Sequence, residues 1–244
     1  MLRFIAIIIF LAFFLILTIP VMLVEWLINK CNPQLRRKSS NAIVKWGFRV
    51  ILFLAGTKIT TIGLENVPKD QAVLYVGNHR SYFDIILLAT LAPGNISFLA
   101  KKEMLRYPLL CHWMMLIDST FLDRDDIKQG LKVILKNIEL LKEGVSVSVF
   151  PEGTRNKTDQ LLLPFHDGSF KMASKSGCPI VIVTYNNTRN IFESHMPRVE
   201  KQHVIMEFSK PFYMSELDPE DRRHIGNYVA NIITETHEKN KELV

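Results

Sequence analysis

The sequence predicts an α/β fold, in which a mixed, largely parallel sheet is flanked by helices and preceded by an N-terminal membrane helix or two-helix membrane motif. Three observations lead to this prediction. The chain opens with a long apolar run, short apolar runs then alternate with helical patterns, and polar clusters follow two of the short runs. Alternating strands and helices are typical of α/β proteins, whose ligands bind beyond the strand ends. We therefore expect a membrane-anchoring segment at 1–56 and a globular domain with a ligand site at 57–244.

The first element is the apolar run 4–24, which has 21 residues and no charged side chain. At about 1.5 Å of rise per residue, a helix of this length spans the roughly 30 Å hydrocarbon core of a bilayer. A secretory signal peptide is the alternative, but its apolar region is shorter and a small-residue cleavage site follows it. Here Glu25, Trp26 and basic residues follow. We expect a retained membrane helix, or a tilted or re-entrant insertion if Pro20 bends the segment.

Basic residues come next, with no acidic residue before Glu65: Lys30, Arg36, Arg37, Lys38, Lys45 and Arg49. By the positive-inside rule, this cluster places the bulk of the protein on the cytoplasmic face of the membrane. If the protein is bacterial, that membrane is the cell membrane. The stretch 42–55 is a second apolar element. It forms either a helix in the lipid interface beside anionic headgroups or a core helix whose two cations reach solvent.

The composition excludes several classes of protein. Only 22% of the residues are charged and 48% are hydrophobic, which excludes intrinsic disorder, collagen and low-complexity sequences. A net charge of +6 and a pI near 9.2 would suit nucleic-acid binding, but the densest basic cluster adjoins the apolar run. Aromatic residues also do not interleave with the cations on a strand platform. We therefore expect a lipid bilayer as a partner and no nucleic acid.

The cysteines and histidines predict neither a disulfide framework nor a metal site. Cys31, Cys111 and Cys178 are odd in number, far apart and without Cys-x-x-Cys spacing, which fits a reducing cytoplasm. Three histidines lack partners at metal-ligand spacing: His112, His166 and His195. We expect no metal and no cofactor.

Beyond residue 56, six short apolar runs are predicted to be strands: 57–62, 72–76, 96–100, 145–150, 180–185 and 203–208. A helix is predicted over 125–143, where apolar residues recur at helical spacing between aspartates and Gly144. A second helix is predicted from Asp218 to about residue 243. Its buried side carries Ile225, Val229, Ile232 and Ile233.

The first polar cluster spans 78–84 and follows a predicted strand. His79 and Asp84 are five residues apart, so they meet only across a turn, with Ser81 as the helix N-cap and Asp84 in the first turn. Asp84 would then fix the tautomer of His79 and raise its basicity, so that the imidazole takes a proton from an alcohol. In the alternative interpretation, Asp84 only complements the helix dipole and His79 is a loop residue.

The second polar cluster spans 151–156 and also follows a predicted strand. Gly153 permits a tight turn, and Arg155 offers a planar fork suited to phosphate. Glu152 either orders Arg155 or accepts a hydrogen bond from a substrate hydroxyl; the alternative is a structural turn with a surface arginine. Lys101 and Arg124 follow other apolar runs, and each is by itself equally consistent with an ordinary surface charge.

Together, Asn78-His79-Arg80-Ser81-Tyr82-Phe83-Asp84 and Phe150-Pro151-Glu152-Gly153-Thr154-Arg155 resemble the NHxSxxD and FPEGTR signatures of the 1-acyl-sn-glycerol-3-phosphate acyltransferase family. Lys101-Lys102-Glu103 and Phe121-Leu122-Asp123-Arg124 resemble two lesser elements of that family. The blocks match in order and spacing, and the resemblance covers roughly 57–213. It implies that 57–244 is an acyltransferase domain of the glycerolipid acyltransferase fold.

The resemblance also implies a reaction and its site. Similar enzymes transfer a fatty acyl group from acyl-CoA or acyl carrier protein to the 2-hydroxyl of lysophosphatidic acid, which yields phosphatidic acid. His79 would remove the hydroxyl proton, Asp84 would orient His79, and backbone N–H groups near the start of the Ser81 helix would stabilise the oxyanion. The resemblance assigns substrate binding to Glu152, Gly153, Thr154, Arg155, Lys101, Arg124 and Ser81.

Two departures from the family pattern bear on the acceptor. Asp167 stands where family members often carry a basic residue, and the 178–183 block lacks a second proline. The acceptor therefore stays open among lysophosphatidic acid, glycerol 3-phosphate, another lysophospholipid and a lysolipid without phosphate. A membrane-surface lipid-binding protein is the non-enzyme alternative, and it requires neither His79 nor Asp84.

Overall fold

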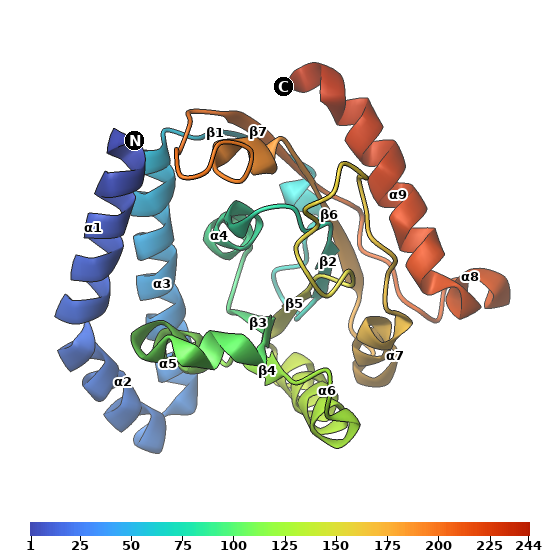
Figure 1. The fold of residues 1–244 in the computed structure, drawn as a ribbon. Helices are drawn as coiled ribbons and strands as arrows, with labels where there is room; N and C mark the ends of the chain where they lie inside the picture. The colour runs from blue at the N-terminus through green and yellow to red at the C-terminus, as the bar shows by residue number, and fades with distance from the viewer.

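A computed structural model describes residues 1–244 and has a seven-stranded sheet at its centre (Figure 1). The strands are β1 (Lys58–Ile62), β2 (Leu74–Gly77), β3 (Ile96–Lys101), β4 (Thr120–Leu122), β5 (Ser146–Val149), β6 (Ile180–Asn186) and β7 (His203–Phe208). Their order in the sheet is β1-β7-β6-β2-β5-β3-β4. Only β6 and β7 pair antiparallel, and every other pair of neighbours is parallel. The predicted mixed, largely parallel sheet is therefore confirmed.

Helices cover both faces of this sheet (Figure 1). They are α1 (Leu2–Leu17), α2 (Ile19–Cys31), α3 (Pro33–Ala55), α4 (Tyr82–Leu91), α5 (Pro108–Leu116), α6 (Ile127–Lys142), α7 (Lys171–Ser176), α8 (Pro219–Arg223) and α9 (Ile225–Asn240). Side chains alternate along each strand, so Tyr75 and Val181 join the core beneath α1, α3, α4 and α5. Leu74 and Ile180 point the other way, into the core beneath α6, α7 and α9.

The predicted strands agree with the structure to within two residues at each end, with β4 as an addition. At three residues, β4 is too short for an apolar pattern to reveal it, and it forms at the sheet edge by pairing with β3. The predicted C-terminal helix is divided at His224 into α8 and α9. Asp167 Oδ1 accepts a hydrogen bond from Gly226 N at the start of α9, so a contact from another segment of the chain fixes this break.

Of the two forms expected for 4–24, the structure has the bent one, because the helix breaks at Thr18. No single helix of the structure is long and apolar enough to cross a bilayer, whereas α1 and α2 meet that criterion as a pair bent by 49°. Pro20 explains the position of the bend, since its ring cannot sit beside the carbonyl of Ile16 in a regular helix. Trp113 Nε1 donates to Thr18 Oγ1 at 3.0 Å, which ties the bend to α5.

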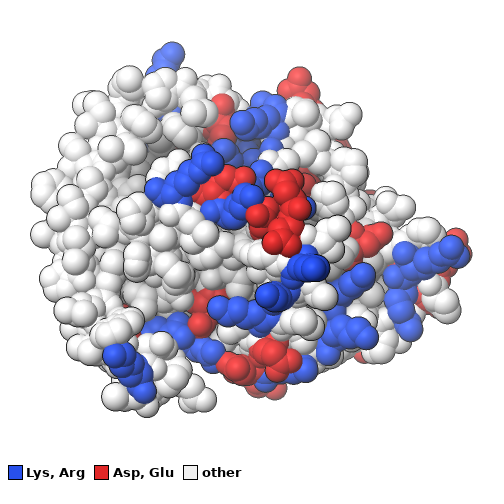
Figure 2. All heavy atoms as spheres, turned by 60° about the horizontal axis from the view of Figure 1, so that its bottom comes forward, with Lys and Arg blue, Asp and Glu red and all other residues white.

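The outer side of α1 and α2 is apolar. Many of its large side chains are exposed, among them Phe13, Leu17, Leu23 and Trp26. Figure 2 shows the left side of the molecule, where α1 and α2 lie in Figure 1, almost free of charged residues, while charges gather over the rest of that view. An apolar surface of this extent is typical of a membrane or protein contact.

The stretch 42–55 lies in α3, which packs against α4 and α1. Val44, Ile51 and Leu52 are buried in the same core as the strands, which supports the core-helix alternative for this face of α3. Lys45 does not extend to solvent as that alternative assumed. Its Nζ instead donates to the carbonyl oxygens of Ala92 and Gly94, at 2.6 and 3.0 Å, just beyond the C-terminus of α4.

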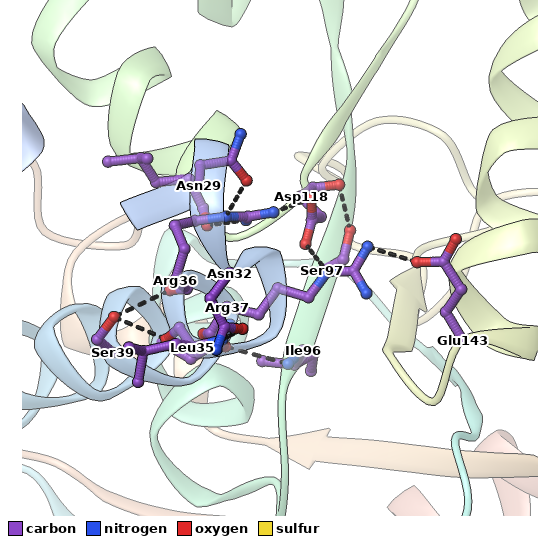
Figure 3. Close-up of polar contacts among 12 residues, drawn as sticks. Asn29, Asn32, Leu35, Arg36, Arg37, Ser39, Ile96, Ser97, Asp118 and Glu143 are labelled. Carbon is purple, nitrogen blue, oxygen red and sulfur yellow. Dashed lines mark hydrogen bonds and ion pairs between the residues drawn. The ribbon is translucent and has the colours of Figure 1, made fainter. Parts of the chain in front are cut away.

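Two arginines of the basic cluster are engaged inside the protein (Figure 3). The Arg36 side chain is 6% exposed; its Nη2 pairs with Asp118 Oδ1 at 2.9 Å, and its Nε donates to Asn29 Oδ1 at 3.1 Å. Arg37 Nε pairs with Asp118 Oδ2 at 2.8 Å, and its Nη2 pairs with Glu143. These contacts fasten the start of α3 to the loop before β4 and to the end of α6. Arg36 and Arg37 therefore contribute to packing within the protein.

We predict that Asp118→Asn lowers the free energy of unfolding by about 3 kcal/mol, because it leaves the buried guanidinium of Arg36 without its carboxylate and takes one of two carboxylate partners from Arg37. Asparagine tolerates the left-handed backbone of Asp118 (φ +59°), so the substitution tests the charge and not the turn. The measurement is chemical denaturation in one detergent. Glu139→Gln, which breaks an exposed pair with Lys142, is the control and should cost less than about 0.5 kcal/mol. Equal effects of the two variants would contradict the prediction.

Candidate active site

The predicted site residues meet at one edge of the sheet, because they follow parallel neighbouring strands. His79 follows β2, Arg155 follows β5, Lys101 ends β3 and Arg124 follows β4. The carboxyl ends of parallel strands share one edge, where α/β proteins bind ligands. The Asn78 side chain secures this edge, since it donates to the carbonyl of Tyr185 at 3.1 Å and accepts from the Tyr185 N–H at 2.9 Å.

His79 and Asp84 are paired, as their spacing predicted. His79 Nδ1 lies 3.0 Å from Asp84 Oδ2, and the same oxygen accepts the backbone N–H groups of Arg80 at 2.8 Å and Ser81 at 2.7 Å. Asp84 Oδ1 accepts from Thr188 Oγ1 at 2.6 Å, and the Asp84 side chain is fully buried. A carboxylate in this position selects the tautomer with hydrogen on Nδ1. The Nε2 atom is then left as an unpartnered acceptor.

Ser81 caps α4, and this part of the prediction is confirmed. Its Oγ accepts the N–H of Phe83 at 3.0 Å, and Asp84 completes a capping box. The N–H groups expected to stabilise an oxyanion already have acceptors within the protein. Asp84 takes the N–H groups of Arg80 and Ser81, Ser81 takes that of Phe83, and Glu193 takes that of Tyr82 at 2.8 Å. The N–H groups at the start of this helix are therefore engaged within the protein, which corrects the expectation of an oxyanion hole there.

Glu152 links the two signature segments. Its Oε1 accepts the N–H of His79 at 2.7 Å and its Oε2 accepts the N–H of Leu163 at 3.0 Å. Of the alternatives considered for Glu152, the ordering of Arg155 is not observed, because the carboxylate supports the backbone of the His79 loop instead. Burial raises the pKa of Glu152 to about 7, although the two N–H groups and the charge of Arg80 act in the opposite direction.

Lys101, Arg124 and Arg155 form a cationic cluster. Lys101 Nζ donates to Thr154 Oγ1 at 2.9 Å. The Arg124 guanidinium lies against Gly153, where a Cβ would sit 2.3 Å from Nη2 and where the backbone is left-handed (φ +67°). Partial burial and then the charges of Arg124, Arg155 and nearby Lys157 lower the pKa of Lys101, against the opposing effect of Glu103. Neighbouring cations of this kind are suited to an anion.

Two residues of the site were missed by sequence reasoning. Thr188 donates to Asp84 from beyond β6, and Glu193 contacts Ser81, Tyr82 and Arg155 from a turn after the short 3-10 helix Thr188–Ile191. Each lies more than 30 residues from its partners in sequence. No spacing or local pattern signals such a contact.

A cavity of about 1010 Å³ opens beside these groups, and 24 of its 41 lining residues are hydrophobic. His79, Lys101, Arg124 and Arg155 form part of its wall. The His79 ring stacks on Phe150 with centroids 4.0 Å apart, so the imidazole meets the cavity on a rigid support. The apolar part of the wall comes from α1, α3, α4, α5 and α6, represented by Phe14, Phe48, Ile85, Met114 and Leu131.

The fold and the site define an acyltransferase. The Acyltransferase family model matches residues 58–186, from β1 to the end of β6. A 1-acyl-sn-glycerol-3-phosphate acyltransferase of Borreliella burgdorferi is 36% identical over 144 residues, which are 59% of this chain and 57% of that protein. A probable enzyme of the same name from Mycoplasma pneumoniae is 30% identical over 91% of this chain and 90% of its own length. The chain belongs to the 1-acyl-sn-glycerol-3-phosphate acyltransferase family.

The matches differ in how much of each relative they cover. The matched part is 57% of the Borreliella protein and 64% of a relative from Saccharomyces cerevisiae, so the chain spans less than two thirds of either. The crystal structure of the 1-acyl-sn-glycerophosphate (LPA) acyltransferase PlsC from Thermotoga maritima superposes with a TM-score of 0.80 at 21% identity. It covers 98% of this chain and 96% of that one, and the likeness establishes the fold.

The raised pKa of Glu152 predicts a pH dependence of stability. Between pH 4.5 and about 7 the folded protein keeps the Glu152 proton that the unfolded chain has lost, so the free energy of unfolding falls as pH rises. We predict that Glu152→Gln removes a decrease on the order of 3 kcal/mol over this range. Denaturation at several pH values measures the slope. The exposed Glu65→Gln variant should keep the wild-type slope, and an unchanged slope in Glu152→Gln would refute the prediction.

Proposed function

We propose that this protein transfers a fatty acyl group from a thioester, acyl-CoA or acyl carrier protein, to the 2-hydroxyl of 1-acyl-sn-glycerol 3-phosphate. The product is phosphatidic acid, which feeds phospholipid biosynthesis. The observation that carries this proposal is the pairing of His79 with Asp84 in the wall of an apolar cavity that also contains the cationic cluster. A base, an anion site and space for an acyl chain are the three parts that this reaction needs.

In the proposed mechanism, His79 Nε2 takes the proton of the acceptor hydroxyl while its oxygen attacks the thioester carbonyl. Asp84 stabilises the imidazolium that forms, because its carboxylate already accepts the proton on Nδ1. Collapse of the tetrahedral intermediate breaks the carbon–sulfur bond, and the imidazolium returns its proton to the departing thiolate. No enzyme-bound acyl group is required. Ser81 is unsuited to carry one, since its hydroxyl donates to Glu193 Oε2 at 2.7 Å.

Lys101, Arg124 and Arg155 are proposed to bind the phosphate of the acceptor, with Gly153 and Thr154 holding two of them in place. Binding at this cluster would bring the neighbouring hydroxyl to His79, and much of the acceleration would come from that orientation. Asp167 does not take part, because its carboxylate is engaged with Gly226 N at 3.0 Å. This engagement accounts for an acidic residue where family members often carry a basic one.

The missing second proline also has a local explanation. Ile182 stands in its place, and its N–H donates to Ser209 Oγ at 2.9 Å, a contact that proline cannot make. The departure therefore belongs to the pairing around β6 and lies away from the cationic cluster. Lysophosphatidic acid stays the acceptor that we propose, and glycerol 3-phosphate, other lysophospholipids and a phosphate-free lysolipid are the comparisons that test it.

The N-terminal helices are proposed to anchor the enzyme in the bilayer, with the catalytic domain on the cytoplasmic face. The exposed apolar side of α1 and α2 supports the anchoring. The inner side of α1 contributes Phe10 and Phe14 to the cavity wall, so an acyl chain bound there would lie next to the anchoring helices. Residues 1–56 and 57–244 therefore differ in role, although they share one hydrophobic core.

We predict that His79→Ala lowers kcat by about 10²- to 10⁴-fold, since it removes the general base. Asp84→Asn should lower kcat as well, because an amide does not stabilise the imidazolium. The measurement is the formation of phosphatidic acid from lysophosphatidic acid and either donor. His195→Ala, at a partly exposed position away from the cavity, is the matched control. Wild-type turnover in a folded His79→Ala variant would overturn this mechanism, whereas absence of turnover in the wild-type protein would favour the lipid-binding alternative.

Arg155→Ala tests the anion site separately. Loss of a charged hydrogen-bonding partner that also orients the acceptor should lower kcat/KM for lysophosphatidic acid by about 10- to 100-fold, through a lower kcat as well as a higher KM. The same variant should leave turnover of a lysolipid without phosphate unchanged, however slow that reaction is. The exposed Lys175→Ala serves as the control for a lost cation. An equal loss with both acceptors would mean that Arg155 does not read the phosphate.

A further inference from the structure

Glu193 lies outside the residues that the family model matches, yet its carboxylate sits between the two signature segments. Oε1 accepts the N–H of Tyr82 at 2.8 Å and pairs with Arg155 Nη1 at 3.2 Å, while Oε2 accepts the hydroxyl of Ser81 at 2.7 Å. The Glu193 side chain is only 11% exposed. One carboxylate therefore joins the start of α4, which carries Asp84, to the arginine proposed to bind phosphate.

Arg155 is held from two directions. Its guanidinium lies over the ring of Tyr82, 3.5 Å from the centroid, and pairs at its edge with Glu193. Tyr82 also donates its N–H to Glu193, so the three residues form a closed unit. A guanidinium has five N–H donors, and only one of those of Arg155 has a partner in the structure. Glu193 therefore fixes the plane of the fork and leaves most of its donors for an anion.

A carboxylate at this position has an electrostatic cost. It weakens the attraction of Arg155 for a phosphate, and burial raises the pKa of Glu193 because the charged form is poorly solvated. Capping of α4 does not require it, since Ser81 Oγ already accepts the N–H of Phe83. Interactions that weaken ground-state binding but improve alignment raise kcat without tightening KM.

We propose that Glu193 is a positioning residue for Arg155. It holds the guanidinium so that the acceptor phosphate binds in one orientation, with the acceptor hydroxyl toward His79. This proposal rests on the proposed acyl transfer to a phosphorylated acceptor. It adds a residue, reached only through the fold, that sets the geometry of the anion site.

Glu193→Gln provides the first test, because glutamine retains an acceptor for Tyr82 N and removes the charge beside Arg155. We expect kcat with lysophosphatidic acid to fall by about 10- to 100-fold while KM for that acceptor stays equal or decreases. Glu193→Asp keeps the charge on a shorter side chain and should restore part of kcat. Glu200→Gln, in the same segment and partly exposed beside His195, is the matched control and should leave both parameters unchanged.

A double-mutant cycle separates positioning from a purely structural role. If Glu193 acts through Arg155, Glu193→Gln has no further effect in an Arg155→Ala background, since the group to be positioned is gone. Equal losses of kcat in the two backgrounds, or a higher KM with unchanged kcat, would overturn the proposal. Each variant in the cycle is also assayed with His79→Ala, and only turnover that this substitution abolishes is compared. Absence of turnover in the wild-type protein would instead refute the proposed function itself.

Discussion

The buried carboxylate of Asp84 is the constraint on which the site depends. An ion with no solvent exposure is tolerated only when its oxygens are fully hydrogen-bonded, and Asp84 accepts four hydrogen bonds. Three of these come from the loop that joins β2 to α4, so the hydrogen bonds that stabilise the carboxylate also fix the conformation of the loop. The fourth comes from Thr188, and it fastens the loop to the short 3-10 helix that follows the neighbouring strand β6. The orientation of the His79 imidazole is a result of this arrangement.

Much of the fold and the centre of the site could be predicted from the sequence, because the signals are local. His79 and Asp84 are only five residues apart, and the apolar runs of the longer strands are long enough to show their pattern. The contacts of Thr188 and Glu193 could not be predicted, since they join segments separated by more than 30 residues. For the same reason, the pairing of Arg36 and Arg37 with Asp118 could not be predicted.

Two carboxylates stabilise the structure around the cationic cluster. Glu152 supports the backbone of the His79 loop, and Glu193 joins Arg155 to the start of α4. Neither carboxylate pairs with Lys101 or Arg124, and both cations line the cavity. Most of the other residues that line the cavity are hydrophobic. A molecule with one anionic group and one long hydrocarbon chain matches that division of the surface.

The shared hydrophobic core has a consequence for attempts to simplify the protein. Ile7, Val44 and Ile51 belong to the same cluster as Tyr75 and Val181 of the central sheet. A chain begun at residue 57 would lack α1 and α3, so α4 would lose its cover and the cavity would lose one wall. Deleting the apolar N-terminus to obtain a water-soluble enzyme would therefore expose the core side chains that α1 and α3 cover. Detergent or lipid is the appropriate medium for the intact catalyst.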